Sequence, residues 1–425
     1  SARPGVPEYC RVLGYVRPAI NFEVRMPTRD WNGKFHMAGC GGLCGSLPND
    51  EPGFMNYSAT ALSRGYAVAV TDTGHWGGNA IDARWAYENI QAREDYAYRA
   101  VHEVARVSKA IIKRFYGKKI EHAYFEGCSN GGRQALMEAQ RYPTDFDGII
   151  AAAPVTDITG FIAQYVWNIQ SNTNAQGQAI FNPAKVNFLG NAVKQACADE
   201  DGLIGDPRQC QFDPATLQCQ PEVSNPKKPL NCFSPAEVAM LRKWYAGPQS
   251  SDGRKLHIEG VPLGSESSWQ GAVGKTSLWR LLMEAYTRYL IFDPAPGPDY
   301  DVLAFNLDKD LPKIKRMADM LGPTDPDLSG FKANGGKLII YSGWADPYAT
   351  PLTPIAYYDA VEKTFGGRKA TQDVTRLFMV PGMNHCGYPD PNSPGIDARG
   401  IDPLTALEQW VEQGDRKSTR LNSSH

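Results

Sequence analysis

The sequence predicts an α/β fold, in which helices flank a mainly parallel sheet. The first observation is a strand over residues 123–126, a helix over 133–141 and a strand over 148–153. Two strands joined through a helix within about 30 residues form a β-α-β unit, and this connection makes the strands parallel. The second observation is that strands and helices also alternate toward both ends of the chain, so the sheet extends beyond this unit.

A long irregular stretch interrupts this alternation. From residue 156 to 336 the sequence is rich in proline and tryptophan and shows no regular succession of strands and helices. We therefore expect a discontinuous core, residues 1–155 and 337–415, and an inserted lid domain, residues 156–336, that covers the active site. Residues 416–425 are polar and patternless, and we interpret them as a tail.

The N-terminal part predicts three strands and a helix. Apolar and polar residues alternate over 21–26, the period of a half-buried strand, and the apolar runs 34–38 and 66–71 also indicate strands. Apolar residues then recur at helical spacing over 101–115, and Gly117 provides the stop. These elements supply the first half of the predicted sheet.

The C-terminal part completes the predicted sheet. Residues 337–341 and 376–380 are apolar enough for buried strands, and residues 354–365 and 404–413 have the pattern of helices. In this part, strands and helices alternate as they do before the inserted lid domain.

The composition describes an ordinary globular protein. Of 425 residues, 42% are hydrophobic and 21% are charged, with a formal net charge of −2. This charge gives no reason to expect nucleic acid as a partner, and no apolar run reaches the roughly 18 residues that a membrane helix needs. We expect a small-molecule substrate, with neither nucleic acid nor membrane as a partner.

The cysteines point to an oxidising compartment. Nine cysteines are many for a reducing cytosol, and they lack the paired CxxC spacing of a zinc site. Disulfides are the better interpretation, so we expect a secreted or periplasmic protein. Because Ser1 opens no charged-then-apolar leader, we take the signal peptide as already removed.

One motif indicates the chemistry. Residues 127–131 read Gly-Cys-Ser-Asn-Gly, a GxSxG between a predicted strand and a predicted helix. In the α/β-hydrolase fold this turn exposes a serine hydroxyl at the carboxyl edge of the sheet. We interpret Ser129 as the nucleophile; the alternative is a plain glycine turn.

A serine nucleophile needs a base, and His385 is the best placed of seven histidines. It follows the last predicted core strand through a short loop, which is where the base of an α/β-hydrolase lies. His75, after an earlier strand, is the runner-up and is more easily explained as structural. The other histidines are interpreted as ordinary core or surface residues.

The base in turn needs a carboxylate that fixes its tautomer. Asp346 follows the predicted strand 337–341 on a loop, and the order Ser129, Asp346, His385 is that of an α/β-hydrolase. Asp373 is the alternative, but it precedes its strand and would lie at the wrong edge of the sheet.

Two backbone amides are candidates for the oxyanion hole. Asn130 follows the nucleophile, and Gly41 lies in the Gly-Cys-Gly-Gly run after strand 34–38. A plain flexible turn is the alternative for that run. Cys128 directly precedes the serine and Cys386 directly follows the histidine, so a bridge between them would join the nucleophile turn to the base loop.

The pattern Cys128-Ser129, Asp346, His385-Cys386 resembles the tannase and feruloyl esterase family, whose members include fungal tannases, type B feruloyl esterases and a bacterial hydrolase of mono(2-hydroxyethyl) terephthalate. The resemblance covers most of the core and continues into the insertion. It implies a serine carboxylesterase that acts on esters of aromatic carboxylic acids and needs no cofactor for its chemistry.

The resemblance also implies features of the insertion. An acidic turn looks like the family's calcium loop in shortened form, so that Asp199, Asp201 and the Leu203 carbonyl are candidate Ca²⁺ ligands; a solvated turn is the alternative. It implies the disulfides Cys197–Cys210 and Cys219–Cys232. Cys10, Cys40 and Cys44 are left with one bridge and one free thiol, and Cys10 with Cys44 is our guess.

The resemblance ranks the substrates. Hydroxycinnamate esters come first, gallates second and terephthalate monoesters third. No lid arginine stands out to bind a free carboxylate, which counts against the terephthalate option. The aromatic side chains of Trp269, Trp279 and Phe305 could stack on an aromatic acid, or they could form the lid's own core. A peptidase, an acyltransferase and a non-catalytic binding protein on the same fold are the alternatives of other classes.

Overall fold

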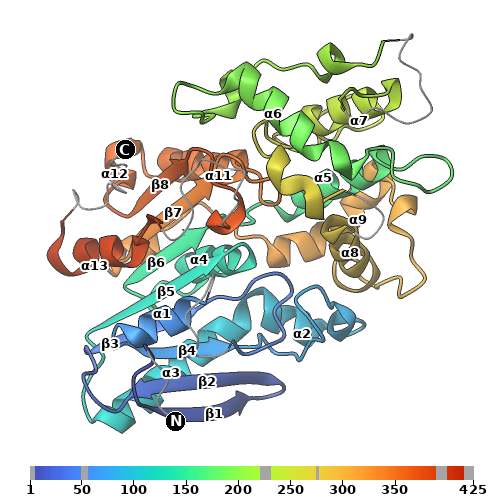
Figure 1. The fold of residues 1–425 in the computed structure, drawn as a ribbon. Coiled ribbons are helices and arrows are strands. Elements are labelled where there is room, and N and C mark those ends of the chain that lie inside the picture. Colours follow the sequence, from blue (N-terminus) through green and yellow to red (C-terminus); the bar gives the residue numbers. More distant parts are fainter. Residues whose placement is uncertain (1–4, 49–55, 221–230, 274–276, 389–399, 416–425) are drawn as a thin grey trace.

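The computed structural model describes residues 5–48, 56–220, 231–273, 277–388 and 400–415. Its described residues form one eight-stranded sheet with the order β1-β2-β4-β3-β5-β6-β7-β8 (Figure 1). The strands are β1 (Tyr9–Val16), β2 (Ile20–Pro27), β3 (Lys34–Ala38), β4 (Ala67–Thr71), β5 (His122–Cys128), β6 (Gly148–Ala152), β7 (Lys337–Gly343) and β8 (Thr375–Val380).

The sheet is mainly parallel, as predicted. The pairs from β4 through β3, β5, β6 and β7 to β8 are all parallel, whereas β1 with β2 and β2 with β4 are antiparallel. The strand β6 and the strand β7, which lie far apart in the sequence, are neighbours: Ala152 pairs with Tyr341. The second half of the core therefore completes the sheet begun by the first, which is the predicted α/β-hydrolase arrangement.

Helices cover both faces of the sheet. The helices α3, α4, α10 and α11 contribute buried side chains to the hydrophobic cluster on one face, and α1 and α13 contribute to the cluster on the other. The helices outside the insertion are α1 (Tyr57–Ser63), α2 (Ile90–Glu94), α3 (Ala100–Tyr116), α4 (Asn130–Arg141), α11 (Leu352–Thr364), α12 (Arg368–Thr371) and α13 (Pro403–Gln413). The helix α3 ends where predicted, because Gly117 adopts the left-handed conformation with φ 65°.

The segment between β6 and β7, residues 153–336, is here called the insertion. It lies beyond one edge of the sheet and is built from helices (Figure 1). These are α5 (Ile158–Ser171), α6 (Val186–Cys197), α7 (Pro235–Ala246), α8 (Leu278–Ala285), α9 (Leu307–Leu321) and α10 (Ser329–Ala333).

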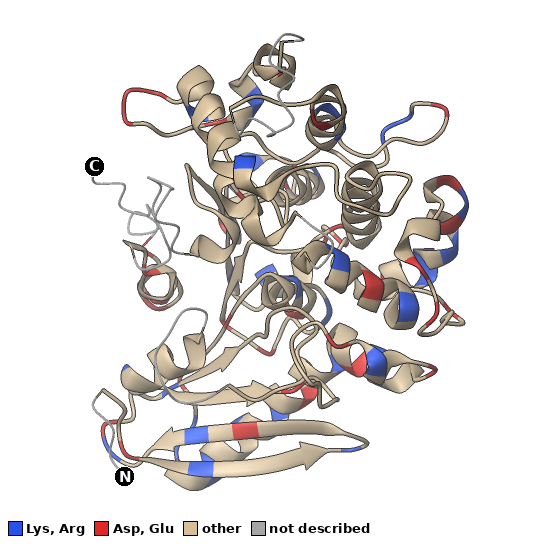
Figure 2. Cartoon of the chain, turned by 45° about the vertical axis from the view of Figure 1, so that its right-hand side comes forward, with Lys and Arg blue, Asp and Glu red and all other residues tan. Residues whose placement is uncertain are grey.

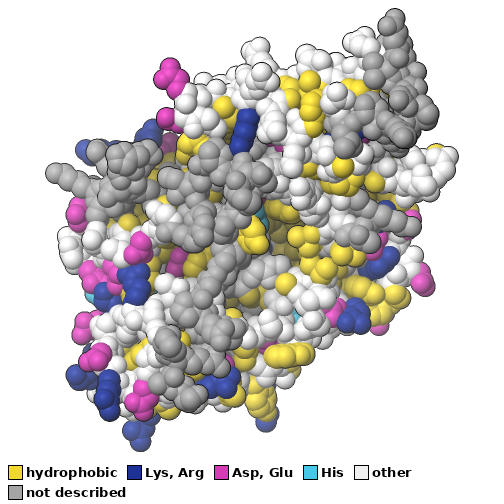
Figure 3. Space-filling view, viewed as in Figure 1, with side chains coloured by type: hydrophobic (Ala, Val, Ile, Leu, Met, Phe, Trp, Pro, Cys, Tyr) yellow, Lys and Arg dark blue, Asp and Glu magenta, His cyan; other side chains and the backbone are white. Residues whose placement is uncertain are grey.

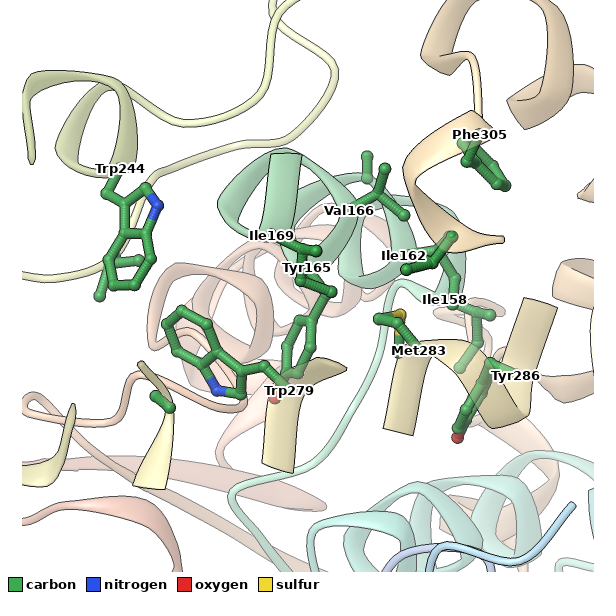
Figure 4. Close-up of a cluster of buried hydrophobic side chains, with 14 of the residues drawn as sticks. Ile158, Ile162, Tyr165, Val166, Ile169, Trp244, Trp279, Met283, Tyr286 and Phe305 are labelled. Carbon is green, nitrogen blue, oxygen red and sulfur yellow. The ribbon is translucent and has the colours of Figure 1, made fainter. Parts of the chain in front are cut away.

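The insertion has its own hydrophobic core. The helix α5 contributes Ile158, Ile162, Val166 and Ile169 to it, together with side chains of α7 and α8 (Figure 4). The rings of Trp244 and Trp279 lie 5.0 Å apart at its centre. This core extends to Tyr96 and Ala97 of the sheet part, so the insertion packs against the main body rather than standing apart from it.

Two strands differ from their predictions. The predicted half-buried strand, β2, is buried on both faces, because its polar residues Glu23 and Arg25 pair with each other at 2.6 Å inside the fold. The strand β1 was not predicted. Its solvent-facing residues include Leu13 and Tyr15, which are 59% and 61% exposed, so an apolar outer face hides the alternation.

Charged residues of both signs are mixed over the sheet part and the insertion (Figure 2). This distribution agrees with the small formal net charge of −2. Among the described residues no helix is both long and apolar enough to cross a membrane.

Candidate active site

Ser129 occupies the sharp turn between β5 and α4. Its backbone has φ 61° and ψ −120°, a conformation that costs a residue with a side chain on the order of 1–3 kcal/mol. The turn is possible because its flanking glycines touch: a Cβ atom on Gly127 would lie 2.6 Å from the Gly131 carbonyl carbon. The strain and the close approach are those of a nucleophile turn, and they hold the Ser129 side chain partly exposed at the end of β5.

His385 and Asp346 meet directly. His385 Nδ1 lies 2.7 Å from Asp346 Oδ2, and the Asp346 side chain is fully buried. The other carboxylate oxygen, Oδ1, accepts the backbone N–H groups of Tyr348 at 2.8 Å and Ala349 at 3.0 Å. These two bonds satisfy the buried carboxylate and aim its free oxygen at the imidazole.

The loops that carry Asp346 and His385 pack tightly on each other. The Ala345 N–H donates to the Met383 carbonyl at 2.9 Å. A Cβ atom on Gly343 would lie 2.0 Å from that same carbonyl oxygen, so only glycine fits there. The approach fixes the acid relative to the base.

Ser129, Asp346 and His385 all follow the carboxyl ends of parallel strands, β5, β7 and β8. They therefore gather at one edge of the sheet. Asp373 precedes β8, and its carbonyl accepts the side chain of Lys337 at the first residue of β7, which is the opposite edge. The structure thus separates Asp373 from the other candidates, as its place in the sequence predicts.

The predicted disulfide is present. Cys128 and Cys386 are bonded, with their Cα atoms 5.8 Å apart, although 258 positions separate them in the sequence. Because each is the direct neighbour of a candidate catalytic residue, the bridge brings the nucleophile turn and the base loop together.

The glycine run after β3 lies against the nucleophile turn. A Cβ atom on Gly39 would lie 2.8 Å from Gly131 Cα, so the two backbones are in contact. Gly41 therefore lies in a loop that packs next to Asn130, the first residue of α4. The guess that Cys10 pairs with Cys44 is wrong: Cys40 pairs with Cys44, only four positions away, and Cys10 is free.

Several residues at this site were not predicted from the sequence. The Asn130 side chain donates to the Cys40 carbonyl at 3.2 Å and accepts from Arg133 Nε at 2.6 Å. The Tyr96 hydroxyl lies 3.0 Å from both Asn130 Oδ1 and the Gly42 carbonyl. A polar side chain directly after the nucleophile was the only local signal for this network.

His75 supports the glycine loop. Its Nε2 lies 2.7 Å from the Leu43 carbonyl, and its ring stacks on Trp85 with centroids 3.7 Å apart. Burial lowers the pKa of His75 to about 4, against the smaller opposing effect of the bond to Leu43, so the ring is neutral and Nε2–H is the donor. This placement agrees with the interpretation of His75 as a structural residue.

The insertion meets the acid loop through aromatic residues. The Tyr348 ring lies 5.5 Å from the His385 ring and 6.1 Å from the Trp279 ring. The Tyr348 hydroxyl reaches the Ser268 carbonyl at 3.3 Å, and its own carbonyl accepts the Tyr165 hydroxyl at 3.1 Å. In the space-filling view hydrophobic side chains gather around a hollow between the two parts of the molecule (Figure 3).

The three candidate substrate-stacking residues lie in the core of the insertion. Trp269, Trp279 and Phe305 are 0%, 1% and 2% exposed. Trp269 also donates its indole N–H to Ser265 Oγ at 3.0 Å. Their burial favours the alternative that they form the insertion's own core, with Trp279 nearest to the site through Tyr348.

The acidic turn of the candidate calcium ligands is closed by hydrogen bonds from its backbone amides. Asp199 Oδ1 accepts the amides of Asp201 and Leu203, and the Leu203 carbonyl accepts the Asp199 amide at 2.8 Å. The turn is closed by its own hydrogen bonds, and within the described ranges no three His, Cys, Asp or Glu side chains are grouped to hold a metal. The expectation of calcium therefore gains no support.

The remaining cysteines pair as the resemblance implies. Cys197 is bonded to Cys210 and Cys219 to Cys232, each pair closing 13 positions of the insertion.

Comparisons with known proteins agree with this geometry. The model of the family described as tannase and feruloyl esterase matches residues 5–424. An uncharacterized esterase of Xanthomonas campestris pv. campestris is 32% identical, over 96% of this chain and 76% of the relative. The mono(2-hydroxyethyl) terephthalate hydrolase of Piscinibacter sakaiensis is also 32% identical, over 96% of this chain and 77% of the relative.

A solved structure shows the same architecture. The crystal structure of feruloyl esterase B from Aspergillus oryzae superposes with a TM-score of 0.83 at 26% identity, covering 96% of this chain and 82% of the other. The chain therefore belongs to the tannase and feruloyl esterase family and is a carboxylic ester hydrolase.

Proposed function

We propose that this protein hydrolyses esters of aromatic carboxylic acids through an acyl-enzyme formed on Ser129. His385 takes the hydroxyl proton as Ser129 attacks the ester carbonyl, and it then gives this proton to the leaving alcohol. Water repeats the attack with the same base and releases the acid. The observation that carries the proposal is the hydrogen bond between His385 and Asp346. The disulfide between Cys386, next to His385, and Cys128, next to Ser129, holds this pair close to the nucleophile.

Asp346 holds the base in its working tautomer. With Nδ1–H donating to Asp346, the proton-accepting Nε2 is free to face the nucleophile. The buried carboxylate also stabilises the imidazolium that forms during each step. His385 must begin each cycle neutral.

The amides of Asn130 and Gly41 stabilise the oxyanion. Asn130 is the first residue of α4, so its N–H has no partner within the helix and carries the positive end of the helix dipole. Gly41 belongs to the loop that packs on Gly131. Two donors fixed before the reaction begins need no reorganisation as negative charge develops.

We place hydroxycinnamate esters, such as methyl ferulate and chlorogenate, first among the substrates. Tyr348 lies next to His385 and is backed by the buried Trp279, so it presents an aromatic wall between the base and the insertion. Such a wall favours a flat aromatic group over a charged or aliphatic one. The relatives named above add gallate and terephthalate monoesters as the other substrates to test.

In this proposal residues 156–336 act as the lid, and residues 1–155 with 337–415 form the catalytic core. Four disulfides suit an oxidising compartment, which supports a secreted or periplasmic protein. No cofactor takes part in any step.

The test is release of acid from methyl ferulate, chlorogenate, methyl gallate and a terephthalate monoester. Wild type, Ser129→Ala and Ser63→Ala are compared, the last replacing an exposed serine of α1. We expect Ser129→Ala to lower kcat/KM by about 10³-fold or more while Ser63→Ala remains at the wild-type level. Equal activity of all three proteins would overturn the mechanism.

Assays with other substrates and acceptors separate the other classes of function. Cleavage of peptides in place of esters would indicate a peptidase, and transfer of the acyl group to an added alcohol would indicate an acyltransferase. Binding of an aromatic ester without turnover would indicate a non-catalytic member of the fold.

A further inference from the structure

Arg133 is a buried cation without an anionic partner. It lies on α4, one turn after the nucleophile, and it is 2% exposed. No carboxylate of the described residues pairs with it. Its guanidinium instead lies 5.0 Å from the centre of the Tyr96 ring and donates to oxygen atoms of neutral groups.

The contacts of Arg133 converge on the candidate oxyanion hole. Nε donates to Asn130 Oδ1 at 2.6 Å, and Nη2 donates to the Tyr96 carbonyl at 2.8 Å. The Asn130 side chain then donates to the Cys40 carbonyl, and the Tyr96 hydroxyl reaches the Gly42 carbonyl at 3.0 Å. Arg133 thus connects the residue after the nucleophile to both ends of the glycine loop.

Arg133 also reaches the main body and the insertion. Nη1 donates to the Ala97 carbonyl at 2.6 Å and to the Leu321 carbonyl, at the end of α9, at 3.1 Å. One planar group therefore holds four segments of the chain: η2 (Asp95–Arg99), α4, the glycine loop through Asn130, and the insertion.

A buried charge next to the candidate oxyanion hole can do more than attach segments of the chain. Removing a cation from water without a counter-ion costs several kcal/mol, and an apolar side chain of similar volume would fill the site at less cost. Hydrogen bonds to neutral carbonyls offset part of that cost but leave the positive charge uncompensated. An anion that forms at the amide of Asn130 would be attracted by this positive charge, which lies one residue contact away.

We propose that Arg133 is a positioning residue for the oxyanion hole, which sets the amide of Asn130 against the glycine loop and keeps a positive charge beside the developing oxyanion. The inference rests on the proposed function. Arg133 acts through Asn130 and does not touch the substrate. Its effect belongs to the anionic intermediate, so it should appear in kcat and leave substrate binding nearly unchanged.

The experiment compares wild type with Arg133→Gln, Arg133→Lys and Arg141→Gln, the last removing an exposed arginine of the same helix. The readouts are kcat and KM on the best ester of the panel, and the Kd of an arylboronate, which adds to the serine as a tetrahedral anion. A fluorophosphonate probe first checks that Ser129 is the reactive serine.

For Arg133→Gln we expect a roughly 30- to 100-fold lower kcat, less than the loss of a donor that touches the oxyanion itself, with KM within about threefold of wild type. Boronate affinity should fall by a similar factor. Arg133→Lys, which keeps the charge but loses the planar fork, should recover part of both losses, and Arg141→Gln should match wild type.

Unchanged kcat in a folded Arg133→Gln protein, or a loss confined to KM, would overturn the inference while Ser129 still reacts with the probe. If wild-type Ser129 does not react, the proposed function itself fails and the inference falls with it. If Arg133→Gln does not fold, Tyr96→Phe replaces it, because it removes only the hydroxyl between Asn130 and Gly42. A three- to tenfold lower kcat at constant KM supports the network, and a wild-type kcat contradicts it.

Discussion

At the scale of single residues, Asp346 carries the sharpest prediction. In Asp346→Asn the side-chain oxygen can still accept the two backbone amides, so its NH₂ group must face His385. The imidazole then carries its proton on Nε2 and cannot accept the one from Ser129. We expect kcat to fall by about 10⁴-fold with the fold retained, measured by ester hydrolysis and circular dichroism.

The matched control is Asp373→Asn, at the opposite edge of the sheet. Its kcat should equal that of wild type. Loss of activity in Asp373→Asn with little loss in Asp346→Asn would exchange the roles of the two residues.

His75 predicts how stability depends on pH. Burial lowers its pKa from 6.5 to about 4 in the folded protein, so between these pH values the unfolded chain binds a proton that the folded chain does not. The free energy of unfolding therefore falls as the pH is lowered from 6.5 to 4, with on the order of 3 kcal/mol from this residue. Above pH 6.5 its contribution is constant.

Urea unfolding of wild type and His75→Gln at several pH values measures this contribution. Other groups titrate in both proteins, so the difference between the two curves is the quantity that reports on His75. We expect that difference to shrink as the pH falls toward 4. Parallel curves would show that His75 is not buried neutral.

The residues whose positions could be predicted are those that a local motif places at a strand end. Ser129, Asp346 and His385 each follow a strand end, so their order and spacing in the sequence carry the information. Arg133 and Tyr96 could not be found in this way, because their partners are backbone carbonyls on segments far away in the chain. Such contacts leave no periodic or spacing signal.

At the scale of elements, the disulfide between Cys128 and Cys386 joins the end of β5 to η10 (His385–Gly387). Replacing both cysteines by serine removes a constraint on the unfolded chain, at a cost of about 3–5 kcal/mol for so long a loop. It also frees the base loop from the nucleophile turn. We expect a lower melting temperature together with at least a tenfold lower kcat, measured by calorimetry and ester hydrolysis.

The pair Cys197 and Cys210 provides the control, since it closes a turn of the insertion. Replacing it by serine should lower stability with a smaller effect on kcat. Equal effects of the two double substitutions on kcat would show that the bridge stabilises the fold without positioning the base.

At this scale, helices and strands were predictable where apolar residues recur along the sequence with a clear helical or strand period. The strands β3 to β8 and the helices α3, α11 and α13 lie within a few residues of their predicted ranges. The strands form a sheet with a continuous apolar interior, and the helices pack an apolar face against that sheet. The helices of the insertion were missed, because its proline-rich connections break the periodicity. The pairing of Cys40 with Cys44 was missed because it depends on the local path of the glycine loop, with φ 59° at Cys44.

At the scale of the whole molecule, the insertion is attached to the sheet part at several buried points. Arg93 of α2 is 3% exposed and donates to the carbonyls of Tyr289 at 2.9 Å and Phe292 at 2.8 Å, both in the insertion. Its Nε donates to the Ala86 carbonyl on its own side. These bonds, with those of Arg133 and Tyr348, attach the insertion to the sheet part.

Arg93→Met tests this coupling, because it keeps an apolar stem and removes the donors. Leaving buried carbonyls without partners should cost about 2–4 kcal/mol, and the cost falls on the attachment rather than on the sheet. Hydrogen exchange followed by mass spectrometry should show faster exchange in α8 and α9, with β5 to β7 unchanged.

The control is Arg106→Met, which replaces an exposed arginine of α3 and should exchange like wild type. Faster exchange throughout the sheet in Arg93→Met would mean that insertion and core unfold together even without this contact. In that case the insertion is part of the folding unit itself and could not open as a separate lid.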